Sequence, residues 1–165
     1  MMESIDRTIV VENQIEIEGQ PPFVWNIFRD LENWPVWNSV CTNAIWLDGP
    51  SWVQGSKFKT KIEIGNKLVE QEAKLLNSDI PWVIEWVSIN NEFEEKRKFE
   101  LDWRGRITIV IDTITLEFKS DPTNTGELTS RYKEMSDQWL LDLKKEVKKN
   151  GDKLWNLSAA ERPRN

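Results

Sequence analysis

The chain has 165 residues, a net charge of −6 and a pI near 4.9. That length suits one domain with a sizeable core, and the negative charge disfavours nucleic acid or an anionic membrane as a partner, because both attract positive charge. Histidine is absent, which leaves little room for a zinc site or for Ser–His and Cys–His nucleophile pairs.

Residues 21–40, which read PPFVWNIFRDLENWPVWNSV, predict two short helices that meet at a bend. A Pro pair suits a helix start, and apolar residues then recur at helical spacing. The polar run from Asp30 to Asn33 interrupts the pattern, and Trp34-Pro35-Val36-Trp37 begins a second turn. Two such short aromatic helices need a concave partner, which the rest of the chain supplies.

Alternation of apolar and polar residues predicts seven strands. We expect them at residues 8–18, 41–48, 55–64, 67–77, 82–87, 93–103 and 106–119. In the last strand the apolar residues move from odd to even positions, so we expect a bulge near Asp112-Thr113 to keep one face on the core.

A long helix is predicted from about Gly126 to a stop at Asn150-Gly151. Its apolar stripe consists of Leu128, Tyr132, Met135, Trp139, Leu140, Leu143 and Val147. The lysines near its end complement the helix dipole and are interpreted as a solvated helix end rather than an anion site. Residues 1–150 are expected to form one domain, followed by a tail, 151–165, that could form one short turn around Trp155 and Leu157.

Cys41 is the only cysteine, so no internal disulfide can form and a reducing compartment is compatible. The N-terminus lacks an apolar signal segment, and no run approaches the roughly 20 apolar residues that span a bilayer. We therefore expect a cytoplasmic protein without integral membrane association. No cofactor is predicted, and the acidic cluster at residues 92–95 lacks the spacing of a calcium loop.

The element order and three motifs resemble the START-like (SRPBCC) helix-grip superfamily, and within it the polyketide cyclase/dehydrase branch. The motifs are Asn33-Trp34-Pro35-x-Trp37, Gly55-x-x-Phe58 and Trp82-x-x-x-Trp86, and the likeness covers roughly residues 8–149. The resemblance implies an α+β fold in which a seven-stranded antiparallel sheet wraps a long C-terminal helix around an apolar cavity. It also implies binding of lipids, polyketides, hormones or other hydrophobic molecules, and some members are aromatases or cyclases.

Ten tryptophans suggest either a lined cavity or an aromatic core. With the cavity that the resemblance implies, the strand and helix faces predict a ligand site of aromatic, aliphatic and a few polar residues. Its expected members are Trp37, Phe58, Ile62, Val69, Gln71, Ile84, Trp86, Arg97, Phe99, Met135 and Trp139. The alternative is that these side chains simply fill the core.

Arg97 is expected to face inward, where a guanidinium must be paired or must meet a ligand anion. We expect a salt bridge with Glu95 or Glu85, and the alternative is an anchor for a ligand carboxylate or hydroxyl. Glu85, Glu95 and Asp112 could act as acid or base if burial raises a carboxyl pKa. Cys41 has no positive neighbour in sequence and is expected to be inert.

Three functions from different classes remain. The leading hypothesis is a carrier or binder of a hydrophobic or amphipathic small molecule. The second is an enzyme that cyclises or dehydrates a polyketide-like substrate with carboxylate acid/base groups, although the absence of histidine counts against it. The third is a protein-interaction module that docks a partner through the bend from Trp34 to Trp37. A monomer or a homodimer is compatible with each.

Overall fold

The computed structural model describes residues 7–155, and the side chains of residues 7–151. Its strands are β1 (Thr8–Glu18), β2 (Cys41–Asp48), β3 (Lys57–Ile64), β4 (Lys67–Asp79), β5 (Val83–Ile89), β6 (Phe93–Trp103) and β7 (Ile107–Phe118). Its helices are α1 (Pro21–Phe28), the 3-10 turn η1 (Leu31–Asn33), α2 (Trp34–Trp37) and α3 (Thr125–Trp155). The predicted strands, the two short helices and the long C-terminal helix are confirmed.

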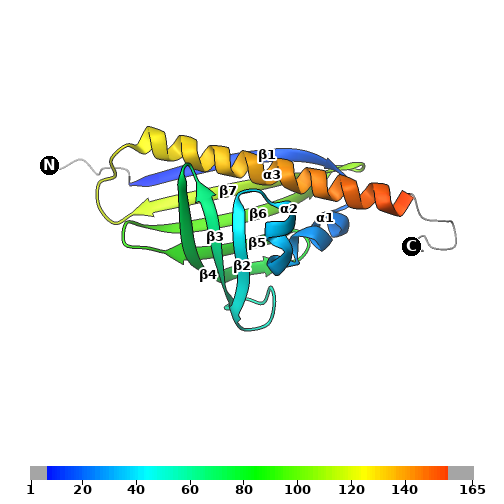
Figure 1. Ribbon diagram of the computed structural model, residues 1–165, viewed down its shortest axis with the longest axis horizontal. Coiled ribbons are helices and arrows are strands. Elements are labelled where there is room, and N and C mark those ends of the chain that lie inside the picture. The colour runs from blue at the N-terminus through cyan, green and yellow to red at the C-terminus, as the bar shows by residue number, and fades with distance from the viewer. Residues whose placement is uncertain (1–6, 156–165) are drawn as a thin grey trace.

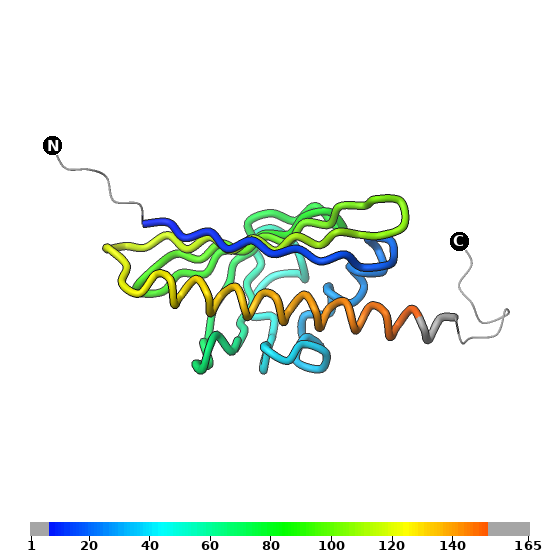
Figure 2. Tube along the Cα trace, turned by 90° about the horizontal axis from the view of Figure 1, so that it is seen from above, coloured from blue at the N-terminus to red at the C-terminus, as the bar shows by residue number. Residues whose placement is uncertain are grey.

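The strands form one antiparallel sheet in the order β1-β7-β6-β5-β4-β3-β2. Figure 1 shows β2, β3 and β4 running steeply across the direction of β1 and β7, so the sheet curves around α3. Seen from above, α3 runs beside β1 for most of its length (Figure 2). The helix therefore covers the concave face of the sheet, and the core lies between them.

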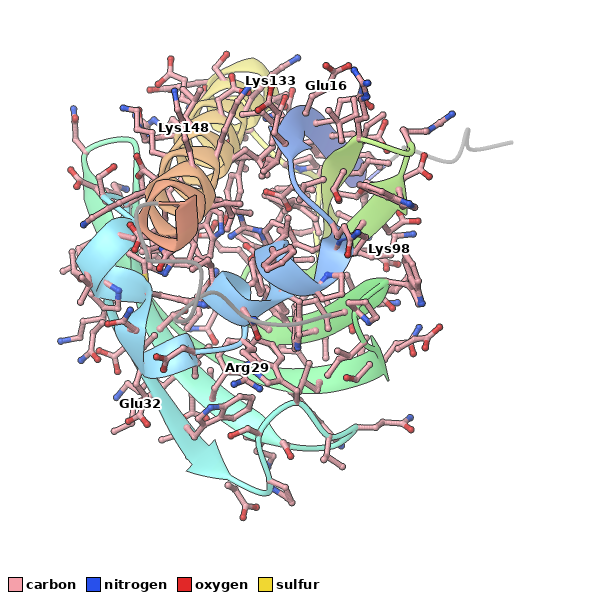
Figure 3. All side chains as sticks on the ribbon, turned by 90° about the vertical axis from the view of Figure 1, so that its right-hand side faces the viewer. Glu16, Arg29, Glu32, Lys98, Lys133 and Lys148 are labelled. Atoms are coloured by element: carbon pink, nitrogen blue, oxygen red, sulfur yellow. The ribbon has the colours of Figure 1, made fainter. Side chains whose placement is uncertain are left out.

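Side-chain alternation explains which face of each element meets the core. The outer face of the sheet carries charged side chains along β3 and β6. Figure 3 looks along α3 and shows Lys98 on that outer side and Lys148 on the solvent side of the helix. The predicted stripe of α3 faces the sheet, with Leu128 half-buried at its start. The remaining stripe residues, Tyr132, Met135, Trp139, Leu140, Leu143 and Val147, are buried.

Strand β7 departs from the prediction, because it has no bulge near Asp112-Thr113. Its pairing with β1 runs without a register shift from Thr8–Glu117 to Glu18–Ile107. Even-numbered positions point inward along the whole strand, and the odd-numbered isoleucines lie half-buried on the outer face. The pattern misled because two inner positions are polar: Thr108 donates a hydrogen bond to the Gly19 carbonyl, and Asp112 lies in an ion pair.

The predicted helix stop at Asn150-Gly151 is also wrong, because α3 continues to Trp155. The Asn150 side chain does not terminate the helix, and its amide instead donates to the Glu146 carbonyl one turn earlier at 2.8 Å. Trp155 therefore belongs to α3. Residues 156–165, including the Leu157 part of the predicted turn, lie outside the described residues.

Most of the interior is filled by contacting aromatic rings, and Trp34 lies at their centre with none of its surface exposed. Its ring centroid lies 5.1–6.1 Å from those of Phe28, Trp52, Phe58, Trp86 and Trp139. Its Nε1–H donates to the Phe28 carbonyl at 2.7 Å. Trp34 and Trp37 are both buried, so the bend does not present its tryptophans to a partner.

Candidate functional site

A pocket of about 350 Å³ opens where the β3–β4 hairpin, the β5–β6 turn and the first turns of α3 meet. We call it the hairpin pocket. It is lined by Ile64, Lys67, Val69, Asn90, Asn91, Glu92, Phe93, Leu128, Arg131 and Tyr132. Aliphatic and aromatic side chains thus alternate with amides and charges, a combination that suits a molecule with an apolar body and a polar group.

Gly65 lets the hairpin come close to α3. Its φ is +64°, which favours glycine, and a Cβ there would lie 2.8 Å from Cδ of Arg131. Arg131 is further held by an ion pair with Glu127 one turn earlier. The hairpin and the helix therefore form one side of the pocket through backbone proximity and a fixed guanidinium.

The deepest residue of the hairpin pocket is Tyr132, which is 2% exposed. Its hydroxyl donates to Oε1 of Glu95 at 2.8 Å, and the Gln71 amide donates to the same oxygen at 3.1 Å. Ser88 pairs with Glu95 across β5 and β6, and its buried hydroxyl has no partner within residues 7–151. A buried polar group thus lies next to an apolar pocket and connects to it through Tyr132.

Burial raises the pKa of the Glu95 carboxyl, against the opposing effects of Tyr132, the Arg97 charge and Gln71. The pKa of the Tyr132 hydroxyl is also raised, first by burial and then by the neighbouring Glu95 charge. Tyr132 therefore remains a donor throughout the neutral range, and Glu95 holds its proton more tightly than an exposed glutamate.

Glu95→Gln is expected to remove a pH-dependent loss of stability. Burial raises the pKa of Glu95 in the folded protein above its usual 4.5. The protonated carboxyl therefore contributes its full share of the free energy of unfolding below pH 4.5, and that share is lost as the pH rises through the folded pKa. Chemical denaturation should therefore show that the wild type and Glu95→Gln are similarly stable at about pH 4, and that Glu95→Gln is more stable than the wild type at about pH 8. Glu94→Gln on the outer face of β6 is the control, and equal curves for both variants would refute the expectation.

Arg97 is paired with Asp112, and both side chains are essentially inaccessible at 1% and 0% exposure. Its Nε and Nη2 donate to the two Asp112 oxygens at 3.0 and 2.7 Å, and Ser136 donates to Oδ2 at 2.7 Å. The guanidinium carbon lies 4.3 Å from the centroid of the Trp139 ring, so the cation also stacks on an indole.

The buried salt bridge expected for Arg97 is present, but its predicted partners were wrong. Glu95 instead accepts hydrogen bonds from Tyr132 and Gln71. Glu85 lies half-buried on the outer face of β5, opposite Lys98. Of the three carboxylates considered for acid/base work, Glu95 is the one that a hydrogen bond connects to a pocket-lining residue, and burial raises the pKa of its carboxyl.

The predicted site residues are brought together in one interior, in three groups. Val69 lines the hairpin pocket, Gln71 joins the polar group around Glu95, and Arg97 lies in the ion pair. The others, Trp37, Phe58, Ile62, Ile84, Trp86, Phe99, Met135 and Trp139, are buried in the core. That they contact a ligand stays a prediction.

Sequence reasoning did not select Ile64, Phe93, Leu128 or the cations Lys67 and Arg131 as site residues, although they line the pocket. The Gly65-Asn66 turn was the available signal, because a two-residue hairpin connection can approach a helix closely.

A second pocket, of about 510 Å³, lies beside α1 and is lined by Trp25, Asn26, Arg29, Asp30, Ser51, Trp52 and Ile80. Arg29 is labelled at this end of the molecule in Figure 3. Trp25 and Trp52 are 8% and 6% exposed, because they pack into the aromatic core, so they offer a ligand little apolar surface.

Burial raises the pKa of the Cys41 thiol to about 11, which agrees with the expected inert cysteine. No group of three acidic or cysteine side chains gathers as a metal site would require within the described chain. In residues 7–155, no helix combines the length and the apolar character needed to cross a bilayer.

The curved seven-stranded sheet, the paired short helices after β1 and the long helix α3 define the START-like (SRPBCC) helix-grip fold. A START superfamily protein from Mycobacterium smegmatis matches with a TM-score of 0.73 and 15% identity, over 86% of this chain and 98% of that one. The Zhui aromatase/cyclase from Streptomyces sp. R1128 matches with a TM-score of 0.73 and 11% identity, over 94% and 99%.

The major latex-like protein 151 from Panax ginseng is similar in the same way, with a TM-score of 0.73 and 13% identity, over 86% of this chain and 98% of that one. No protein-family model and no curated protein matches the sequence. At these identities the likeness establishes the fold, and the function must be argued from the site.

Proposed function

We propose that the chain binds a small hydrophobic or amphipathic molecule in the hairpin pocket. The observation that carries this proposal is a pocket of about 350 Å³ that is lined by both apolar and polar side chains and ends at a buried hydrogen-bonding group. Small-molecule sites typically have volumes of roughly 300–1,000 Å³, with mainly apolar walls and a few placed polar groups. The pocket is at the small end of that range, which favours a compact ligand or the end of a longer one.

The charges around the pocket narrow the ligand class. Lys67 and Arg131 lie at its wall together with the single carboxylate of Glu92. Because Arg131 is already paired with Glu127, Lys67 is the better placed cation for a polar or acidic group of the ligand. An amphipathic molecule would then contact Val69, Phe93 and Leu128 with its apolar part.

The composition supports the cellular setting of this proposal. An acidic chain with one buried thiol is suited to a reducing cytoplasm and is a poor binder of nucleic acid. In this proposal the chain carries its ligand as a monomer or a homodimer.

Leu128→Trp is expected to fill the pocket and to abolish binding of the reporter 1-anilinonaphthalene-8-sulfonate. Leu128 lines the pocket, so a larger side chain there occupies the space that the ligand needs. Leu141→Trp places the same substitution on the exposed side of the same helix and is the matched control. The reporter is excited at a wavelength longer than those that indole absorbs, so that the introduced tryptophans do not contribute to the signal. Its emission should rise on addition of the wild type or of Leu141→Trp and should not rise with Leu128→Trp.

Two results would count against the pocket. Equal reporter binding by Leu128→Trp and the wild type would move the site elsewhere. No binding by the wild type, of this reporter or of competing fatty acids and aromatic ketones, would remove the binder proposal.

An enzyme that dehydrates or cyclises its ligand is the second candidate, favoured by Glu95. A carboxyl with a raised pKa can give a proton to a leaving hydroxyl near neutral pH. Tyr132 donates to Glu95 and lines the pocket. For turnover, the Tyr132 hydroxyl would turn from Glu95 toward the ligand, give its proton to the leaving hydroxyl and take the Glu95 proton in its place. Glu95→Gln should abolish dehydration or cyclisation of the ligand while the protein still binds it.

A further inference from the structure

The pocket of about 510 Å³ beside α1 takes no part in the proposed function. We call it the α1 pocket. Its walls come from the end of α1, from the loop between β2 and β3, and from the turn between β4 and β5. Figure 3 looks toward the end of the molecule that carries α1 and labels Arg29, one of the lining residues, there.

The α1 pocket is a surface feature and lies far from the hairpin pocket. Lys67, the first residue of β4, lines the hairpin pocket, whereas Ile80, just beyond the end of β4, lines the α1 pocket. The 13 residues of β4 span roughly 40 Å at about 3.3 Å per residue. Five of the seven lining residues are exposed, and the two that are buried, Trp25 and Trp52, belong to the aromatic core.

Trp52, at the wall of the α1 pocket, has a backbone φ of +60°, which a bulky residue rarely adopts. Its indole holds it there, because Nε1 donates to the Arg29 carbonyl at 2.6 Å and the ring centroid lies 5.1 Å from that of Trp25. Costly backbone conformations persist only where the surroundings enforce them, and they concentrate at active sites and ligand-binding sites. Trp52 therefore points to a functional site and fixes the β2–β3 loop against the end of α1.

The β2–β3 loop is held at its flanks as well. The Ser56 hydroxyl donates to the Pro50 carbonyl at 2.6 Å, and a Cβ on Gly49, where φ is +82°, would lie 2.5 Å from that hydroxyl oxygen. The Gly55 N–H donates to the Leu75 carbonyl, and the Leu75 N–H donates to the Ser56 carbonyl, so the loop is bonded to β4. This wall of the α1 pocket is thus preorganised, which lowers the entropy lost on binding.

The α1 pocket presents one cation and one anion that do not pair with each other. Arg29 and Asp30 are neighbours in the chain and both line it, yet neither side chain has an ion pair or a hydrogen bond within the described part of the chain. The side chains of Asn26 and Ser51 at the same walls likewise lack a partner within residues 7–151. Helix α1 also ends here, and the negative end of a helix dipole favours a cation beside it.

We propose that the α1 pocket binds a small zwitterion, an aliphatic α-amino acid, with its carboxylate at Arg29 and its ammonium group at Asp30. A simple anion would be repelled by Asp30 and a simple cation by Arg29, whereas a molecule that carries both charges on one carbon is attracted by both side chains. Ile80 is 43% exposed and gives the aliphatic side chain its apolar contact. The proposal does not depend on whether a ligand fills the hairpin pocket.

The test is a titration with L-leucine, followed in ¹⁵N–¹H spectra through the backbone amide signals of Asn26, Asp30 and Ser51. L-Leucinamide lacks the carboxylate and 4-methylpentanoate lacks the ammonium group, so each analogue removes one charge and keeps the side chain. Leucine should move the three signals to saturation, and each analogue should bind about fivefold more weakly. The signals of Lys67 and Phe93, which line the hairpin pocket, should stay in place.

Arg29→Gln and Asp30→Asn should each weaken leucine binding by about fivefold. Both side chains are exposed, so the substitutions should leave the fold intact. Arg106→Gln and Asp137→Asn remove exposed charges of the same two kinds away from the α1 pocket and are the matched controls.

Three results would overturn the proposal. The first is the lack of saturable movement with alanine, valine, leucine and methionine as free amino acids. The second is equal binding of leucine and either analogue, or equal binding by Arg29→Gln and Arg106→Gln. The third is movement confined to Lys67 and Phe93 and lost in Leu128→Trp, because it would place the amino acid in the hairpin pocket.

Discussion

Replacing Asp112 with alanine is expected to lower the free energy of unfolding by about 3–5 kcal/mol, because it leaves a buried guanidinium without its partner. Arg97 is 1% exposed and gives both hydrogen bonds of its fork to Asp112. Equilibrium denaturation in urea gives the difference directly. The Arg97 charge is the cause of the loss, so removing that charge as well should reverse most of it.

Two further variants isolate the ion pair from simple loss of volume. Arg97→Met with Asp112→Leu replaces the pair by apolar side chains, a change that is often neutral or stabilising. Glu100→Ala removes a carboxylate from the partly exposed pair with Lys98 and should cost less than about 1 kcal/mol. An Asp112→Ala variant as stable as Glu100→Ala would refute the buried pair as a determinant of the fold.

Trp34→Ala is expected to cost about 3–5 kcal/mol, since it opens a large cavity at the centre of the aromatic core. The ring is fully buried and contacts five other aromatic rings. The substitution also removes the indole N–H that donates to the Phe28 carbonyl, so that carbonyl loses this hydrogen bond. Thermal and urea denaturation should both show the loss.

Trp82→Ala is the matched control for that substitution, because its side chain is 45% exposed in the turn before β5. A surface change of this kind should alter stability by about 0.5 kcal/mol or less. Trp34→Phe keeps one ring and should fall between the two. Similar losses in Trp34→Ala and Trp82→Ala would mean that Trp34 is not the centre of the core.

The elements with a clear period were predictable from sequence. The alternation at residues 8–18 and 93–103 and the stripe along α3 follow from burial of one face, and the structure has strands β1 and β6 at those bounds. Whether a residue in a strand or a helix faces the core depends on its place in the repeat of that element, so the spacing of apolar residues in one sequence is enough to show it.

The errors come from contacts between segments that are distant in sequence. Asp112 interrupts the apolar series of β7, and a bulge was the local explanation for the interruption. The true reason is Arg97 on β6, which pairs with Asp112 inside the sheet. Partner choice depends on strand register, and here register places Phe99 opposite Asp112 with Arg97 one step along the same face.

The candidate site was less predictable than the fold. The hairpin pocket depends on how closely the turn at Gly65 approaches α3, and on side chains from three separate segments. Alternation identified Val69 as inward, but it could not show that Leu128 and Arg131 line the same pocket as Lys67.

Native mass spectrometry of the protein, purified from the organism that produces it, tests the central claim of a filled hairpin pocket most directly. We predict a bound small molecule in addition to the 19.5 kDa chain for the wild type and for Leu141→Trp, and the bare chain for Leu128→Trp. A bare wild-type chain, or a bound mass retained equally by Leu128→Trp, would contradict the account.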